Sequence, residues 1–309
     1  MAGKKILLMG LLFFILHGCS GSDDQTVHVD FSKKMRVENV GRNRNGLLRV
    51  AVSSMTSPRQ TLINYQDLIV YVSDQLVRKP QFIQRKTYRE VNELLGKKQL
   101  DFAFICSGAL VEAEESGIHL RILAVPVINN EANYHAVIIV RKDSPYRAFD
   151  DLLGAKFAFT DPLSHTGYRY PLYLLKLRHT TPEKFFRRTF FTYAHDYSIQ
   201  AVSRGIVDAA SVDELIYLYL KRVSPEKVKN IRILHRSEPF GMPPVVSPAG
   251  LHPKLDRQIQ QILLHMHKTE RGKSILNMLG IQRFTTADST SYESVRKIYR
   301  MTRSIKSAL

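Results

Sequence analysis

Short apolar runs alternate with segments of helical periodicity along most of this 309-residue chain. Strands are predicted at residues 48–53, 81–86, 101–105, 119–127, 135–141, 156–160, 189–193, 207–212 and 230–235. Helices are predicted at residues 60–77, 88–95, 168–177, 251–267, 270–279 and 292–307. Alternating strands and helices are typical of parallel sheets flanked by helices, so the sequence predicts an α/β fold.

Two segments are suited to join two α/β lobes. The first is residues 142–145 (Lys-Asp-Ser-Pro), after the strand at 135–141, and the second is residues 237–244, which contain three prolines. The predicted domains are a first lobe at 47–141, a second lobe at 142–237, a return to the first lobe at 238–285 and a basic C-terminal helix at 286–309. Two crossings make a hinge, and ligands of open α/β sheets lie at the carboxyl ends of the strands.

The stretch 157–168 reads as a buried strand that runs into a turn of small hydroxyl residues. Residues 168–177 continue as a helix, which places Ser164, His165 and Thr166 at its first turn. Backbone N–H groups there have no intrahelical acceptor, and with the helix dipole and two hydroxyls they can hold a tetrahedral oxyanion. The alternative is an ordinary N-cap, for which Ser and Thr are preferred.

Several motifs occur in an order that resembles the periplasmic solute-binding proteins of phosphonate, phosphite and phosphate ABC transporters. They are residues 48–54 (Leu-Arg-Val-Ala-Val-Ser-Ser), 88–95 (Tyr-Arg-Glu-Val-Asn-Glu-Leu-Leu), 101–108 (Asp-Phe-Ala-Phe-Ile-Cys-Ser-Gly), 138–144 (Ile-Ile-Val-Arg-Lys-Asp-Ser), 161–168 (Asp-Pro-Leu-Ser-His-Thr-Gly-Tyr), 195–196 (His-Asp) and 239–246 (Pro-Phe-Gly-Met-Pro-Pro-Val-Val). The resemblance covers roughly residues 47–285. It implies a two-lobed periplasmic-binding-protein fold of type II that closes on an oxyanion and serves an ABC permease.

The resemblance also implies ligand contacts from the second lobe. Ser164, His165 and Thr166 would bind the oxyanion, partly through backbone N–H groups. His195 directly follows the strand at 189–193 and matches a histidine that reaches the oxyanion in the family. A neutral imidazole donates one hydrogen bond, which suits this role. The alternative is that His195 only caps the following helix.

First-lobe contacts are expected at the ends of the first two strands. Ser53, Ser54 and Thr56 follow the first strand, and Tyr88 follows the second. Tyr88 can donate its hydroxyl or cover the ligand with its ring, although a lone Tyr at a helix start is often only packing.

Cys106 and Ser107 end the third strand and are also expected at the cleft. Because a thiol is a weak donor, Cys106 is ordinarily interpreted as a small buried residue. The alternative is a ligand for a thiophilic species such as arsenite, which would make the protein a sensing subunit for a membrane histidine kinase.

Asp213, at the end of the strand at 207–212, either touches a protonated ligand oxygen or caps the next helix. The crossing at 241–244 (Gly-Met-Pro-Pro) lacks the carboxylate with which aminoalkylphosphonate binders of the family pair the ligand amine. The sequence therefore favours phosphate, phosphite or a small neutral-tailed phosphonate.

The N-terminus predicts export. Lys4 and Lys5 precede an apolar run at residues 6–16, so residues 1–18 are predicted to be a signal peptide. The apolar run is too short to span a bilayer.

Cys19 follows a sequence that resembles the bacterial lipobox, whose cysteine is acylated and becomes the mature N-terminus. His17 departs from the small residue usual there, which leaves simple secretion as the alternative. Residues 19–46 have little to bury and are predicted to be the lipidated cysteine and a flexible tether. We therefore expect a periplasmic or otherwise extracytoplasmic protein that is anchored to a membrane by lipid.

The chain is strongly basic. Removing the segment with Lys4 and Lys5 lowers the formal net charge of +17 by two, to +15. Such a charge suits nucleic acid, anionic lipid or an anionic small ligand, and export together with the lack of a nucleic-acid motif argues against the first. We expect a monomer.

Enzyme patterns are weak. Ser164, His195 and Asp196 could form a nucleophile, base and orienting group, but Asp196 is adjacent to His195 in sequence and no Gly-x-Ser-x-Gly elbow occurs. His265 and His267 point to diverging faces of a helix, unlike zinc ligands. No P-loop or dinucleotide fingerprint is present. We expect no catalysis, no metal and no cofactor; a protein that kept the fold and lost its ligand is a further alternative.

Overall fold

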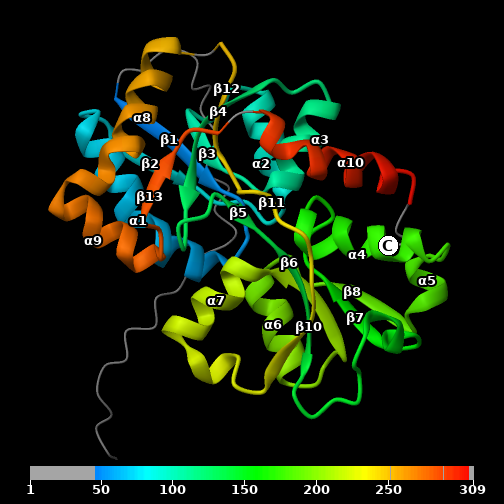
Figure 1. The fold of residues 1–309 in the computed structure, drawn as a ribbon. Helices are drawn as coiled ribbons and strands as arrows, with labels where there is room; N and C mark the ends of the chain where they lie inside the picture. Colours follow the sequence, from blue (N-terminus) through cyan, green and yellow to red (C-terminus); the bar gives the residue numbers. More distant parts are fainter. Residues whose placement is uncertain (1–45, 251, 288, 306–309) are drawn as a thin grey trace, which may run out of the picture. The chain divides into compact units, whose positions relative to one another are not determined.

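The computed structural model describes residues 46–250, 252–287 and 289–305 (Figure 1). The predicted signal peptide, Cys19 and nearly all of the tether lie outside the described residues. Two sheets dominate the fold. The six-stranded sheet has the order β13 (Arg283–Thr285), β4 (Leu120–Val127), β12 (Val245–Pro248), β3 (Phe102–Phe104), β1 (Leu47–Val52), β2 (Lys79–Ile83). The five-stranded sheet has the order β10 (Ile231–Arg236), β6 (Ala136–Arg141), β9 (Ala209–Asp213), β7 (Lys156–Phe159), β8 (Arg188–Phe191).

Helices cover both sheets (Figure 1). Those around the six-stranded sheet are α1 (Pro58–Gln75), α2 (Tyr88–Gly96), α3 (Ser107–Glu115), α8 (Pro253–His265) and α9 (Glu270–Leu279). Those around the five-stranded sheet are α4 (Tyr170–Leu177), α5 (Pro182–Phe185), α6 (His195–Ser203) and α7 (Glu214–Val223). Single turns occur at η1 (Phe149–Leu152), η2 (His165–Arg169), η3 (Pro225–Lys227), η4 (Met266–Lys268) and η5 (Ser289–Tyr292), and α10 (Glu293–Thr302) is the last described helix. Within the described part of the chain, no helix combines the length and apolar character needed to cross a membrane.

Both sheets are mixed rather than purely parallel. Strand β1 runs parallel to β2 and β3, and β7 runs parallel to β8 and β9, as βαβ connections predict. Strand β12 is antiparallel to β3 and β4, and β6 is antiparallel to β9 and β10. The chain enters the second lobe through β6 and returns to the first through β12 without a crossover helix, so the expectation of parallel sheets was wrong for these strands, and β12 was not among the predicted strands.

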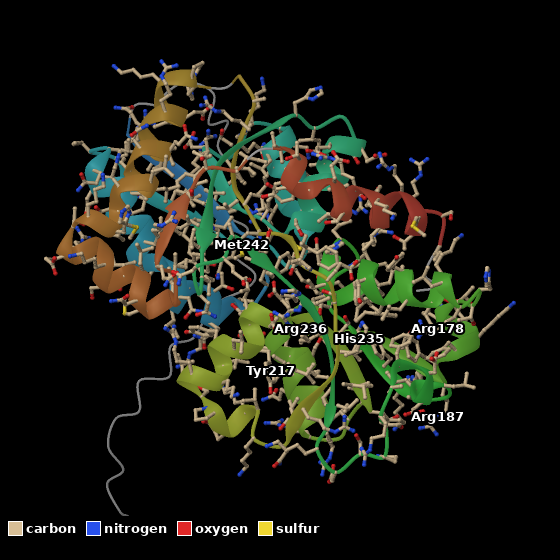
Figure 2. All side chains as sticks on the ribbon, viewed as in Figure 1. Arg178, Arg187, Tyr217, His235, Arg236 and Met242 are labelled. Carbon is tan, nitrogen blue, oxygen red and sulfur yellow. The ribbon has the colours of Figure 1, made fainter. Side chains whose placement is uncertain are left out.

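The boundary predicted after residue 141 is also corrected. Strand β6 was placed in the first lobe, but it pairs with β9 and β10 in the five-stranded sheet. The first crossing therefore precedes β6 and contains β5 (Asn133–Tyr134), which pairs with β11 (Phe240–Gly241) of the second crossing. Met242, labelled in Figure 2, is buried on that second crossing. The two crossings thus run side by side between the sheets.

Two clusters of buried apolar side chains form the core: the larger joins the six-stranded sheet to one face of the five-stranded sheet, and the smaller covers the other face of the five-stranded sheet. Leu48, Phe102 and Val246 are fully buried in the first lobe, and Val137 and Ile199 are fully buried in the second. Burying such a side chain contributes about 1.5–3 kcal/mol. Alternating apolar patterning therefore accounts for the sheets, while the polar residues discussed below lie where strands end and helices begin.

Helix α10 contacts both lobes. It packs on α3 of the first lobe and on η2 and α4 of the second (Figure 1). Arg296 pairs with Glu114 at 2.9 Å, and the Tyr299 hydroxyl donates to Glu112 at 2.5 Å. The Arg169 guanidinium lies over the Tyr299 ring, 4.9 Å from its centroid. The basic helix predicted at the C-terminus is thus packed between the lobes.

Candidate functional site

The turn after β7 has the geometry of an anion site. The Ser164 hydroxyl accepts a hydrogen bond from Gly167 N–H at 2.9 Å, and Tyr170 N–H bonds to the His165 carbonyl, which makes a wide π-helical turn ahead of α4. Such turns are frequent at functional sites. A Cβ on Gly167 would collide with the Thr160 side chain, so glycine lets the turn lie directly on the end of β7.

Residues of this turn are fully buried, with polar atoms that lack partners. Ser164, His165 and Thr166 have no exposed surface. The Thr166 hydroxyl has no hydrogen-bond partner among the described residues. Buried polar groups are nearly always paired, so an unpaired hydroxyl at a helix start indicates a place for a ligand.

His195, at the start of α6, presents one defined donor. Its Nδ1 accepts a hydrogen bond from Asp213 N–H at 3.1 Å and lies 3.2 Å from the Thr160 hydroxyl. Because a backbone N–H can only donate, the neutral ring carries its proton on Nε2. Nε2 is buried and has no partner in the described chain. Burial lowers the pKa of His195 to about 3, so the ring is a neutral donor.

The first lobe brings two more hydroxyls to this place. Tyr88 and Ser53 are fully buried, and neither hydroxyl has a partner at hydrogen-bond distance among the residues described. Burial raises the pKa of Tyr88 well above its usual value, Cys106 and Asp213 raise it further, and the nearby Ser164 hydroxyl lowers it slightly. Tyr88 is therefore a neutral donor that lies beside residues of both lobes.

Asp213 lies next to these donors. Its Oδ1 accepts a hydrogen bond from Leu215 N–H at 2.8 Å, which caps α7. Burial raises the pKa of Asp213 to about 7, an effect opposed by the Leu215 N–H and reinforced by Glu214. Near neutral pH this carboxyl is partly protonated, and it also accepts from the Ile216 N–H. The two roles predicted for Asp213, capping and ligand contact, are compatible.

Hydrogen bonds across the cleft hold the two lobes together around the site. In each, a backbone N–H at or next to a helix start in one lobe meets an oxygen of the other lobe. They are Tyr88 N–H to Asp161 Oδ2 at 3.1 Å, His195 N–H to the Met55 carbonyl at 3.0 Å and Ser57 N–H to Asp196 Oδ1 at 2.9 Å. The cleft is therefore closed in this structure, which explains why the site residues are buried.

Residues 50–292 match the family described as ABC transporter, phosphonate, periplasmic substrate-binding protein. The chain belongs to this family. It is 27% identical over 169 residues to the phosphonates-binding periplasmic protein of Escherichia coli, an alignment that covers 53% of this chain and 50% of the relative. The chain thus spans about half the length of that relative. It is 21% identical over 221 residues to a probable ABC transporter phosphite-binding protein of Prochlorococcus marinus, covering 68% of this chain and 74% of the relative.

Solved structures confirm the predicted two-lobed, type II periplasmic-binding-protein fold. A binding component of an ABC phosphonate transporter from Pseudomonas aeruginosa superposes with a TM-score of 0.78 at 20% identity, over 85% of this chain and 90% of that one. The Prochlorococcus marinus protein PhnD1, in complex with methylphosphonate, gives a TM-score of 0.74 at 19% identity, over 84% and 99%. The predicted family resemblance is confirmed as well.

Three hydroxyls predicted for the site of this phosphonate-binding family member are engaged elsewhere. Each is bonded to another group of the chain. Ser54 donates to the Arg85 carbonyl at 2.5 Å, Thr56 pairs with Thr61 at 2.9 Å and Ser107 pairs with Tyr134 at 2.5 Å. We therefore do not retain these hydroxyls as contacts to the oxyanion.

The side chains of His165 and Cys106 have surroundings that differ from the predicted ligand contacts. The His165 ring packs edge-on against Phe240 of β11, with ring centroids 4.2 Å apart, and burial lowers its pKa to about 3. Burial raises the pKa of the Cys106 thiol, and the N–H groups of His165 and Gly108 lower it. The ring of His165 thus faces a crossing, and Cys106 is a buried thiol at the start of α3.

Several residues of the site were not predicted. Asp161 and Asp196 bridge the lobes, and Thr160 positions His195. Gly108 fits because a Cβ there would collide with the Leu163 carbonyl oxygen and lie 2.7 Å from His165 N. Asp161 directly follows a predicted strand, which was the only local signal; the others depend on contacts between segments far apart in sequence.

Proposed function

We propose that this chain is an extracytoplasmic solute-binding protein that captures a phosphorus oxyanion for an ABC permease. One observation carries the proposal: of the buried polar groups that have no partner in the described chain, four potential donors belong to the ends of strands and starts of helices that meet from both lobes. These four donors are Ser53 Oγ, Tyr88 OH, Thr166 Oγ1 and His195 Nε2. All are neutral, so the ligand's charge is met by fixed dipoles at a helix start that need little rearrangement.

The arrangement supports capture by lobe closure. The second lobe supplies Thr166 and His195 together with N–H groups of the turn after β7, and an open cleft would expose them to an incoming anion. Closure brings Ser53 and Tyr88 over the ligand and forms the bonds to Asp161 and Asp196. The crossings β5 and β11 are suited to act as the hinge. The closed protein is then the form that the permease recognises.

An enzymatic role has no support from this geometry. Asp196, proposed as an orienting group for His195, instead accepts from Ser57 N–H of the other lobe. His195 Nδ1 is bound by Asp213 N–H, and the Ser164 hydroxyl is bound by Gly167 N–H. These residues therefore do not form a nucleophile, base and orienting group, and binding without catalysis is the role we propose.

The proposal includes the location. Members of this family are periplasmic binding proteins, and the lipobox-like sequence at Cys19 favours attachment to a membrane by lipid. The sensing role with arsenite is not carried further, because Cys106 is a single buried thiol whose pKa is raised. Monomeric function remains part of the proposal.

Isothermal titration calorimetry of the purified full-length chain with methylphosphonate, phosphite, phosphate and sulfate tests the proposal. We expect binding of at least one of the three phosphorus oxyanions and weaker binding of sulfate. Absence of heat with all three, from a chain that melts cooperatively, would contradict the proposal and favour a fold that has lost its ligand.

A further inference from the structure

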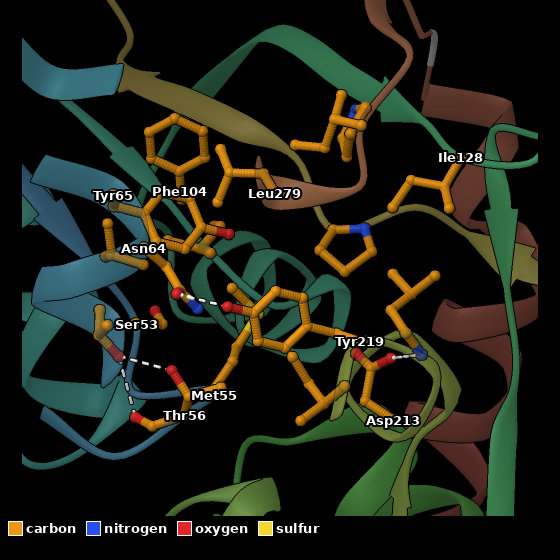
Figure 3. Close-up of a pocket in the computed structure, with 18 of the residues that line it drawn as sticks. Ser53, Met55, Thr56, Asn64, Tyr65, Phe104, Ile128, Asp213, Tyr219 and Leu279 are labelled. Carbon is orange, nitrogen blue, oxygen red and sulfur yellow. Dashed lines mark hydrogen bonds between the residues drawn. The ribbon is translucent and has the colours of Figure 1, made fainter. Parts of the chain in front are cut away.

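An apolar cavity of about 90 Å³ lies between the lobes, and Ser53, one of the four donors, belongs to its lining (Figure 3). Ser53 and Asp213 line it, so it continues directly from the oxyanion site. The rest of its wall is largely apolar and comes from both lobes and the first crossing. Prominent members are Tyr65, Phe104, Ile128, Leu215, Ile216 and Phe284.

Most polar groups of this cavity are already paired. Thr56 bonds to Thr61 at 2.9 Å, and the Tyr219 hydroxyl donates to Asn64 Oδ1 at 2.7 Å, as the dashed lines in Figure 3 mark. Asp213 Oδ1 is occupied by Leu215 N–H. Asp213 carries the one carboxyl group of the lining, and this group also accepts from the Ile216 N–H. Ser53, which the cavity shares with the donor end, is a lining residue whose hydroxyl has no partner in the described chain.

The cavity suits an apolar tail better than a charged one. An ammonium group carries a charge and three donors, and the lining has one carboxyl group to meet that charge, that of Asp213, which already accepts from the N–H groups of Leu215 and Ile216. Pro243 and Pro244 of the second crossing line the cavity and add no acceptor side chain. An alkyl chain loses contact with water there and needs no partner.

Size restricts the tail further. A cavity of about 150 Å³ admits benzene, and this cavity of about 90 Å³ is clearly smaller. A short unbranched chain fits within it, whereas an aromatic ring requires the wall to move.

We infer that this protein binds alkylphosphonates with a short apolar tail, such as the propyl group, in preference to methylphosphonate and to aminoalkylphosphonates. The phosphonate head meets the four donors and the tail enters the cavity. This inference rests on the function proposed above.

The test is calorimetry of the full-length chain with methyl-, ethyl-, propyl- and 2-aminoethylphosphonate. Propyl- and 2-aminoethylphosphonate form a matched pair, because they differ only in a methyl group against an ammonium group. We expect affinity to rise about fourfold per added methylene, which corresponds to about 0.8 kcal/mol, and so about 15-fold from methyl- to propylphosphonate. 2-Aminoethylphosphonate should bind more weakly than propylphosphonate.

Two variants of α7 test whether the alkyl tail of the ligand occupies the cavity. Leu215→Phe enlarges a side chain that lines the cavity, whereas Leu218→Phe makes the same change one turn away, where the side chain is 37% exposed and outside the cavity. Leu215→Phe should remove the advantage of about 15-fold that propylphosphonate has over methylphosphonate. Leu218→Phe should leave this ratio as in the unchanged chain.

The outcomes separate the two proposals. If no phosphonate binds, the proposed function fails. If phosphonates bind but affinity does not rise with chain length, or 2-aminoethylphosphonate binds more tightly than propylphosphonate, the inference about the tail fails while the proposed function stands. The ligand series on the unchanged chain decides this even if Leu215→Phe does not fold.

Discussion

The two ends of the cleft between the lobes are built in opposite ways. At the donor end, Ser53, Tyr88, Thr166 and His195 are buried with polar atoms left unpaired. In the adjoining cavity, which shares Ser53 with the donor end, Thr56 is paired with Thr61 and Tyr219 with Asn64, and most of the remaining wall is apolar. Since an unpaired buried group is costly and a paired one is not, the first arrangement demands a polar ligand and the second accepts any group of suitable shape. Recognition of a head and tolerance of a tail therefore follow from hydrogen-bond pairing alone.

The largest expected loss of affinity comes from a substitution that prevents the two lobes from closing. Gly108→Ala places a Cβ against the backbone of Leu163 and His165 in the other lobe, and backbone atoms cannot rotate out of the way. The lobes should no longer close fully, and methylphosphonate affinity should fall by about 100-fold.

Calorimetry measures this loss, and circular dichroism checks that the fold persists. Gly46→Ala is a matched control in the same lobe, since a Cβ there meets no atom within 4 Å. Equal affinity of Gly108→Ala and the unchanged chain would show that closure does not bring these segments together.

A smaller effect distinguishes an unpaired hydroxyl from a paired one. Thr166→Val removes a hydroxyl without changing shape, and loss of a hydrogen bond to a charged ligand costs about 1.5–3 kcal/mol. All phosphonates should then bind about 10- to 100-fold more weakly, with the preference for a propyl tail unchanged.

Thr56→Val is the counterpart in the cavity, where the hydroxyl is bonded to Thr61. It should lower the free energy of unfolding by about 1 kcal/mol and alter methylphosphonate affinity little. The comparison breaks down if Thr56→Val weakens binding as much as Thr166→Val does in calorimetry.

Phosphonate affinity should depend on pH through Asp213, which lies where the donor end meets the cavity. Asp213 has its pKa raised from 3.8 to about 7, so it ionises above neutral pH beside the anion. Affinity for phosphonate should fall several-fold between pH 6 and 8.5, because each pKa unit corresponds to about 1.4 kcal/mol. Asp213→Asn keeps an acceptor for Leu215 N–H and should flatten this fall; an equally steep decline in calorimetry of the variant would assign the titration to another group.

The free energy of unfolding should also depend on pH, in directions that follow from the shifted pKa values of Asp213 and His195. Between pH 3.8 and 7 the folded chain binds more protons at Asp213 than the unfolded chain, so this group makes stability fall as pH rises. His195, with its pKa lowered from 6.5 to about 3, has the opposite effect between those values. Urea unfolding of Asp213→Asn should therefore show stability that rises more steeply with pH than in the unchanged chain.

The smallest effect is expected at Cys106. This thiol is buried with a raised pKa and acts as a weak donor at most. Cys106→Ser should leave phosphonate affinity within about twofold, because the thiol contributes at most a weak hydrogen bond and serine is of similar size. A marked loss in calorimetry would place the thiol in contact with the ligand.

Local signals predicted much of this molecule, and contacts between distant segments account for the rest. The strand, hydroxyl turn and helix around Thr166 are specified by consecutive residues, so the donor end could be anticipated. Strand β6 was recognised as a strand but assigned to the wrong sheet, because an apolar pattern predicts a strand without indicating which strands it pairs with. The links through Asp161 and Asp196 and the paired lining of the cavity join residues up to 155 positions apart, as in Asn64 and Tyr219, which no local pattern encodes.

Helix α10 is expected to affect the rate at which a ligand is released. Opening the cleft must part α3 from η2 and α4, and α10 is attached to Glu112 on one side and to Arg169 on the other. The rate at which a bound molecule escapes thus depends on residues that never touch it. Residence time can then be lengthened or shortened by substitutions in the last described helix, independently of which ligand is selected.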